Sequence, residues 1–225
     1  ELLTLRKKER YSKRNQAMDG LYQFVTVEEA IEFQLRLNKE KPSYQYKTRP
    51  TGLYIETKMW QFYQDRKIDI ATMLYDVLTK YELNTVAKAE ALMPIILECF
   101  EGGSLKVLKE ITDLPLVFLM GNHELVEAMA MIKDAATFAH AIGPTSSLVV
   151  DGQSKLIKDL ARNLGLAMHP WYVRDDFLTH EKTASAENMI YYNMGMDGIF
   201  SEFTHTTQQT YLDAAQKSTP NLLIQ

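Results

Sequence analysis

The feature that most restricts the fold of this chain is a regular alternation of strand-like apolar segments with segments of helical periodicity. Short runs of β-branched and aromatic side chains indicate strands, whereas apolar residues spaced three or four apart indicate helices. The expected strands cover residues 52–58, 94–100, 116–120, 138–143, 166–173 and 198–203. The helices that follow them are expected at residues 69–81, 104–111, 124–132, 152–163, 185–193 and 207–216.

This alternation predicts an α/β fold with a parallel sheet and helices outside it. No glycine-rich turn follows the first strand, which weighs against a doubly wound sheet that binds a dinucleotide. A TIM-type (β/α)8 barrel has eight such units in about 250 residues. About six units are expected here, in a chain that starts abruptly at Glu1, so we predict an incomplete barrel whose first two units are missing. Residues 1–225 would then form one partial domain.

One further helix is expected before the first strand, at residues 25–39. Thr26 opens it, and Glu28 and Glu29 lie in its first turn, where the helix dipole favours acidic side chains. A polar linker at residues 41–50 is expected to lead from this helix into the first strand.

Composition excludes some classes of protein. The formal net charge of the 225 residues is −4, so no basic excess exists to meet the phosphates of a nucleic acid. No run approaches the roughly 20 apolar residues that cross a bilayer. Cys99 is the single cysteine, so no disulfide framework forms within the chain. The oligomeric state and the cellular location are left open.

The first expected strand, residues 52–58, carries an unusual charged pair. Side chains alternate along a strand, so Tyr54, Glu56 and Lys58 share one face. A solvated edge strand would explain the pair, and so would a site that holds a cation or a phosphate, because buried charges are costly unless they are used.

Polar residues also gather where the other expected strands end. Glu98 lies near the end of the second strand, His169 and Trp171 in the fifth and Glu202 at the end of the sixth. In a β/α barrel the carboxyl ends of all strands lie on one face, where binding and catalytic residues collect. We therefore expect these side chains to converge, with His169 deeper than Trp171 as a satisfied core histidine.

Several of these segments resemble the glycerophosphodiester phosphodiesterase family, in the branch of bacterial periplasmic enzymes and their eukaryotic relatives. The similar segments occur in the family's order and span nearly the whole chain. They are residues 52–58 (GLYIETK), 96–101 (ILECFE), 141–144 (AIGP), 168–175 (MHPWYVRD) and 196–203 (MDGIFSEF).

The resemblance implies a reaction and a site. Members hydrolyse a glycerophosphodiester to glycerol 3-phosphate and an alcohol, in glycerol and lipid metabolism, and a periplasmic or secretory-pathway location would fit. Glu56 would be a ligand of a divalent metal, Ca²⁺ or Mg²⁺, and Lys58 would contact the phosphate. Phe100 and Trp171 would line the pocket for the glycerol part, and Glu98 would contact the substrate.

The chain also departs from the family pattern. The His-Arg-Gly, Glu-x-Asp and His-Asp motifs of the first two family strands are missing. These motifs would supply the two histidines that act as acid and base and two of the three metal carboxylates. No catalytic residue is therefore assigned, and the chain is expected to be the C-terminal two-thirds of the domain, inactive alone. Glu98 stands in place of the usual Gln, Glu202 in place of Asp and Thr204 in place of Pro.

Two other interpretations remain. The chain could be a non-catalytic binding or interaction domain in which the lost motifs reflect decay. It could also be another barrel phosphodiesterase, such as a sphingomyelinase-D-like or phosphoinositide-cleaving enzyme, which would use similar chemistry on a different head group.

Overall fold

The computed structural model describes residues 2–40, 50–150 and 154–218. The chain divides into two compact units, each described below by itself. The smaller unit comprises residues 1–53 and 76–95, and the larger unit comprises residues 54–75 and 96–225. The expectation that residues 1–225 form a single domain stays a prediction.

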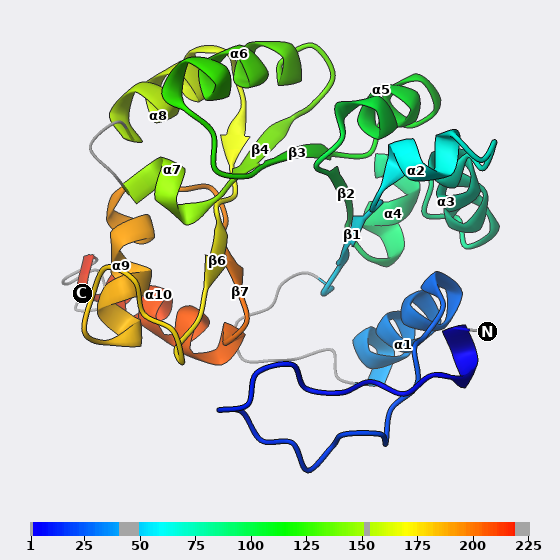
Figure 1. Cartoon of the computed structure of the whole chain (residues 1–225), viewed down its shortest axis with the longest axis horizontal. Helices are drawn as coiled ribbons and strands as arrows, with labels where there is room; N and C mark the ends of the chain where they lie inside the picture. The colour runs from blue at the N-terminus through cyan, green and yellow to red at the C-terminus, as the bar shows by residue number, and fades with distance from the viewer. Residues whose placement is uncertain (1, 41–49, 151–153, 219–225) are drawn as a thin grey trace, which may run out of the picture. The chain divides into compact units, whose positions relative to one another are not determined.

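The larger unit contains most of the strands and helices (Figure 1). The strands are β1 (Leu53–Glu56), β2 (Ile95–Cys99), β3 (Leu116–Met120), β4 (Ala141–Pro144), β5 (Ala167–Met168), β6 (Trp171–Val173) and β7 (Phe200–Ser201). The helices are α2 (Trp60–Gln64), α3 (Ile70–Lys80), α5 (Gly102–Ile111), α6 (Leu125–Ala135), α7 (Ser146–Val150), α8 (Ser154–Asn163), α9 (Ala184–Asn193) and α10 (Thr204–Ser218). Of these elements β1, β2 and α3 extend across the boundary between the units.

Neighbouring strands in the sheets are also neighbours in the chain. One sheet has the order β1-β2-β3-β4-β5, and β6 pairs with β7 in a second. The pairs from β2 to β5 and the β6–β7 pair are parallel, and a parallel bridge between Thr145 and Trp171 links the end of β4 to β6. A doubly wound sheet reverses its strand order partway, whereas a β/α barrel does not. The predicted α/β fold is confirmed, and the strand order is consistent with an incomplete barrel.

The core of the larger unit lies between the sheet and the helices that cover it. Helices α5, α6 and α8 lie along one side of strands β2–β4 (Figure 1). All five residues of β3 are buried, as expected for a central parallel strand that is covered on both faces. Buried side chains such as Leu105 of α5, Ile132 of α6 and Ala161 of α8 supply the helical side of this core.

The smaller unit contains η1 (Leu2–Thr4), α1 (Val27–Glu40) and α4 (Val86–Leu92). Helix α1 begins with a capping box. The Thr26 hydroxyl accepts from the backbone N–H of Glu29 at 3.1 Å, and the Glu29 carboxylate accepts from the N–H of Thr26 at 2.7 Å. Lys80 forms an ion pair of 2.7 Å with Glu28, which joins the end of α3 to α1 within this unit. The start predicted from Thr26 is confirmed.

Three predicted elements need correction. The strand expected at 166–173 is two short strands, because Pro170 has no N–H to donate to a ladder and separates β5 from β6. The strand expected at 138–143 begins only at Ala141, because α6 runs three residues further than expected and closes with a turn in which Thr137 donates to the carbonyl of Asp134. The strand expected at 198–203 is reduced to Phe200–Ser201, since α10 already begins at Thr204.

Short helices were not expected from the sequence. Helices α2, α4 and α7 have five to seven residues, too few to show a helical period. The linker expected at 41–50 falls, apart from Pro50, outside the described residues, as do the first two residues of the helix expected at 152–163. Among the helices that the described residues form, none combines the length and the apolar character needed to cross a membrane.

Candidate functional site

The pairing of β1 with β2 places two carboxylates beside each other. The backbone N–H of Thr57 donates to the carbonyl of Glu98 at 3.0 Å, so the end of β1 runs along the end of β2. Glu56 is the last residue of β1, and Glu98 is the fourth of five residues in β2. Both side chains therefore lie at the carboxyl ends of neighbouring strands, the edge where sites form in parallel α/β folds.

A set of hydrogen bonds, two of them buried, holds this end of β1 in place. The Thr57 hydroxyl lies 2.7 Å from that of Ser104 in α5, and the thiol of Cys99 donates to the carbonyl of Thr57 at 2.8 Å. The Glu101 carboxylate accepts from the backbone N–H groups of Trp60 and Gln61 at 2.9 and 2.8 Å. These bonds hold the turn after Lys58 against α5 and so restrict where the Glu56 and Lys58 side chains can lie.

Glu56 and Lys58 form an ion pair. The Lys58 Nζ is 2.6 Å from Oε2 of Glu56, and the side chains of Lys58 and Glu56 are 71% and 19% exposed, respectively. Because the ammonium remains largely exposed, the pair is open on the lysine side. Such a cation can turn toward an anion that enters from solvent.

Glu98 is the more unusual carboxyl group. It is 7% exposed, and its Oε2 has no hydrogen-bond partner among the described residues. Burial, and then the negative charge of Glu56, raise the pKa of Glu98 to about 7, while the ammonium of Lys58 acts in the opposite direction. The group therefore changes charge near neutral pH.

Aromatic side chains face these charged groups. The indole Nε1 of Trp171 donates to the carbonyl of Gly143 at 2.9 Å, which fixes the ring at the start of β6. Phe100 meets Trp171 edge to face with 5.6 Å between ring centroids, and Phe200 meets Tyr54 in the same way at 4.8 Å. The hydrogen bond and the ring contacts give one side of the site a defined apolar surface.

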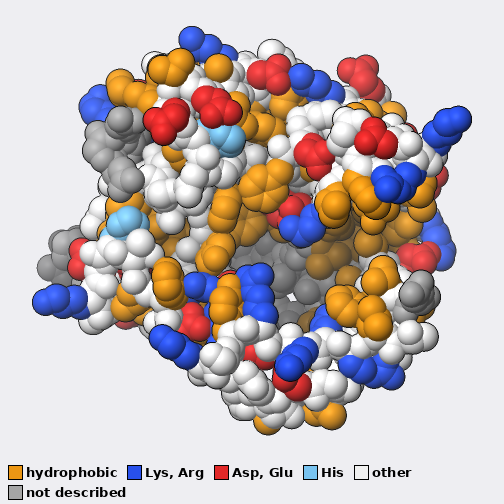
Figure 2. Space-filling model, in the orientation of Figure 1, with side chains coloured by type: hydrophobic (Ala, Val, Ile, Leu, Met, Phe, Trp, Pro, Cys, Tyr) orange, Lys and Arg blue, Asp and Glu red, His pale blue; other side chains and the backbone are white. Residues whose placement is uncertain are grey.

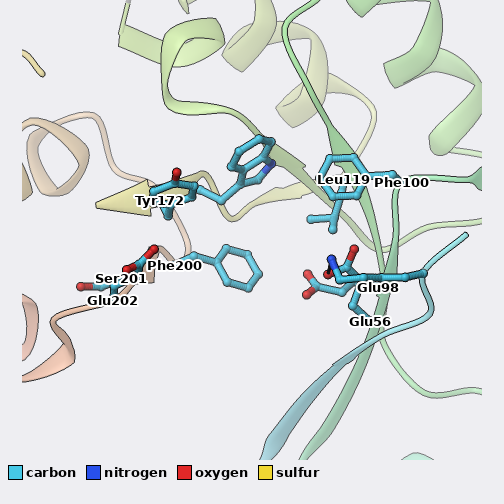
Figure 3. Close-up of a pocket in the computed structure, with 10 residues that line it drawn as sticks. Glu56, Glu98, Phe100, Leu119, Tyr172, Phe200, Ser201 and Glu202 are labelled. Carbon is cyan, nitrogen blue, oxygen red and sulfur yellow. Dashed lines mark ion pairs between the residues drawn. The ribbon is translucent and has the colours of Figure 1, made fainter. Parts of the chain in front are cut away.

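One pocket of about 380 Å³ collects all five residues predicted from the sequence (Figure 3). Its lining residues are Glu56, Lys58, Glu98, Phe100, Leu119, Trp171, Tyr172, Phe200, Ser201 and Glu202. Figure 3 shows the carboxylates of Glu56 and Glu98 on one side, with Phe200 and Tyr172 opposite them. Hydrophobic, acidic and basic side chains meet between the ends of strands β1–β3 and β6 in the space-filling view (Figure 2).

The pocket contains residues that sequence reasoning did not assign to the site. Leu119, Tyr172, Phe200 and Ser201 were counted only as parts of strands, and Glu202 was expected to converge but was given no role. All of them lie at or beside the carboxyl end of a parallel strand. That position was the available signal, but the exact end of each strand decides which side chain enters the pocket.

His169 does not line this pocket. Its Nδ1 is 3.0 Å from the hydroxyl of Tyr54. Burial lowers the pKa of His169 against an opposing effect of Asp197, whereas burial and then the charge of Glu98 raise the pKa of Tyr54. The two neutral groups thus satisfy each other, as expected of a core histidine, and no histidine of the described residues lines the pocket.

The described residues fit a divalent cation only in part. Ca²⁺ takes six to eight oxygen ligands, and Mg²⁺ is held by one or two carboxylates together with water and substrate phosphate. Glu56 and Glu98 provide two neighbouring carboxylates, but no cluster of three or more His, Cys, Asp or Glu side chains suited to a metal occurs in the described part of the chain. These residues alone do not complete a metal centre, and Glu56 as a ligand stays a prediction.

No protein-family model matches the chain. Among solved structures, it is similar to an Agrobacterium tumefaciens C58 protein that bears the provisional description of a glycerophosphoryl diester phosphodiesterase, with 14% sequence identity and a TM-score of 0.48. The match covers 65% of this chain and 52% of that one, about half of the neighbour's length.

Proposed function

We propose that this pocket binds a glycerophosphodiester and that the protein containing this chain hydrolyses it to glycerol 3-phosphate and an alcohol, with Mg²⁺ or Ca²⁺ as cofactor. The supporting observation is that the five residues selected from the resembling motifs line one pocket at the strand ends. The pocket also has the two kinds of surface that such a substrate needs, a charged side and an apolar side.

The charged side suits the phosphate. Lys58 would contact a phosphate oxygen and stabilise negative charge that develops there, since its ammonium is accessible at the mouth of the pocket. Glu56 would lend one carboxylate to a cation, which when bound neutralises the phosphate charge. Phosphate binding would also loosen the Glu56–Lys58 ion pair and free the carboxylate for that purpose.

The apolar side suits the glycerol part. Phe100 and Trp171 present ring edges and faces against which the C–H groups of a polyol can pack. Trp171 is held more firmly than Phe100, because its indole N–H donates a hydrogen bond to the Gly143 carbonyl of β4.

The reaction also needs a proton donor for the leaving alkoxide. In this proposal the donor and the remaining metal carboxylates come from a part of the protein outside these 225 residues. The isolated chain is therefore expected to bind ligand but to turn over glycerophosphocholine negligibly.

The test is a metal titration of hydrolysis. The protein containing this chain is assayed for release of glycerol 3-phosphate from glycerophosphocholine, with Mg²⁺ and Ca²⁺ varied separately. Glu56→Ala is expected to lower activity by about two orders of magnitude or more, since even indirect supports of a metal ligand are worth roughly 10- to 100-fold. Glu110→Gln, at an exposed position of α5, is the matched control.

Four outcomes would contradict the proposal. A Glu56→Ala variant with the metal response of the wild type would remove Glu56 as a ligand. Clear metal-dependent turnover by the isolated chain would show that the missing groups are not required. Absence of any hydrolysis by the full protein would favour a non-catalytic binding domain, and cleavage of a different head group would favour another phosphodiesterase class.

A further inference from the structure

The pocket holds a polar atom that nothing in the described chain satisfies. Oε2 of Glu98 is buried and without a hydrogen-bond partner, in a residue that is 7% exposed. A buried polar group without a partner costs roughly 1–3 kcal/mol, so such groups in native proteins call for an explanation. Because Glu98 lines the pocket, a bound molecule can supply the missing donor.

The neighbouring cation does not serve this purpose. Lys58 places its Nζ at 2.6 Å from Glu56, on a side chain that is 71% exposed, while Glu98 lies deeper. The fixed rings of Phe100 and Trp171 lie close by in the same pocket, and they favour a neutral partner with C–H surface. A hydroxyl group on a short carbon chain combines a hydrogen-bond donor with such a surface.

We propose that Glu98 is a specificity-determining residue that accepts hydrogen bonds from hydroxyl groups of the polyol part of the substrate. The inference rests on the proposed function, because it assumes that a phosphate lies at Lys58. It goes beyond the proposed function by assigning the recognition of the substrate hydroxyl groups to Glu98, whose buried Oε2 lines the pocket without a partner among the described residues. A ligand without hydroxyl groups would leave Oε2 unpaired and would bind correspondingly less well.

The experiment compares two ligands of similar size. Glycerol 3-phosphate and n-propyl phosphate are titrated by calorimetry into the protein that contains this chain, at one pH and with Mg²⁺ present. The wild type is expected to prefer glycerol 3-phosphate by about 10- to 100-fold, the range that hydrogen bonds to a charged group supply. Glu98→Leu, which has no acceptor, should lower this ratio to about one, and Glu98→Gln, which keeps an acceptor oxygen, should retain part of it.

The outcomes separate this inference from the proposed function. If neither phosphate binds, the proposed function fails and the inference fails with it. If both bind equally to the wild type, the pocket holds phosphate but the role of Glu98 is wrong. If the preference for glycerol 3-phosphate exists and persists in Glu98→Leu, a group other than Glu98 binds the hydroxyl groups. The comparison in the wild type keeps the test decisive even if Glu98→Leu does not fold.

Discussion

Replacing Glu98 by glutamine should change how the stability of the fold depends on pH. The pKa of Glu98 is raised from its ordinary 4.5 to about 7 in the folded chain, mainly by burial. The folded state therefore binds a proton between these values that the unfolded state has already released. The contribution of Glu98 to the free energy of unfolding is fully present below about pH 4.5 and is lost as the pH rises through 7. The slope of this free energy against pH follows the difference in the number of protons bound by the folded and unfolded states.

The size of the effect follows from the shift. From 4.5 to about 7 is about 2.5 pH units, and each unit corresponds to about 1.4 kcal/mol, which gives on the order of 3 kcal/mol. With 7% exposure little solvent screening reduces this figure, although Lys58 can move closer and relieve part of it. A glutamine side chain at this position would stay neutral at every pH. We therefore expect the free energy of unfolding of Glu98→Gln to rise by roughly 2–3 kcal/mol relative to that of the wild type as the pH goes from 5 to 8.

Urea unfolding followed by circular dichroism measures this difference. Both proteins are unfolded at several pH values in buffer with EDTA, so that no bound cation compensates the charge. Glu110→Gln, an exposed substitution, should change stability by no more than about 0.5 kcal/mol at any pH. A Glu98→Gln difference that stays constant with pH, or that falls as the pH rises, would refute the reasoning about burial.

Two further predictions concern the support of the site. Thr57→Val removes a buried hydroxyl that lies 2.7 Å from that of Ser104, and should lower the free energy of unfolding by about 1–2 kcal/mol in urea unfolding at pH 7; an unchanged midpoint would mean that this bond does not hold the end of β1. Trp171→Phe removes the donor to the Gly143 carbonyl and should weaken glycerol 3-phosphate binding several-fold in calorimetry, at a stability cost of about 1 kcal/mol. Unaltered binding by that variant would remove Trp171 from the glycerol side of the pocket.

The elements with a strong local signal were predictable from the sequence. Strand β3 was expected at its observed bounds, because a run of five apolar residues is typical of a buried parallel strand and short for a helix. Helix α1 was expected from Thr26, since its cap depends only on the side chains of the first turn. The face shared by Glu56 and Lys58 followed from the alternation of side chains along a strand.

Other features depend on contacts that the sequence does not reveal. The sequence signalled the break at Pro170, since a proline cannot donate to a strand ladder, but only the pairing of β5 with β4 and of β6 with β7 shows that the segment forms two strands. Tyr172 and Ser201 reach the pocket only because β6 and β7 end where they do. The lack of a partner at Glu98 Oε2 likewise follows from packing, since Lys58 turns to Glu56 instead.

The most direct test of the central claim, that this pocket binds the phosphate of a glycerophosphodiester at Lys58, is calorimetry. Glycerol 3-phosphate is titrated into the wild-type protein that contains this chain and into its Lys58→Ala variant. Lys133→Ala, at an exposed position on α6, is the matched control for the loss of one positive charge. We predict saturable binding at one site in the wild type and in Lys133→Ala, and at least about tenfold weaker binding in Lys58→Ala, since a charge-assisted hydrogen bond is worth roughly 1.5–3 kcal/mol. Equal affinity in all three proteins, or no binding to the wild type, would contradict the account.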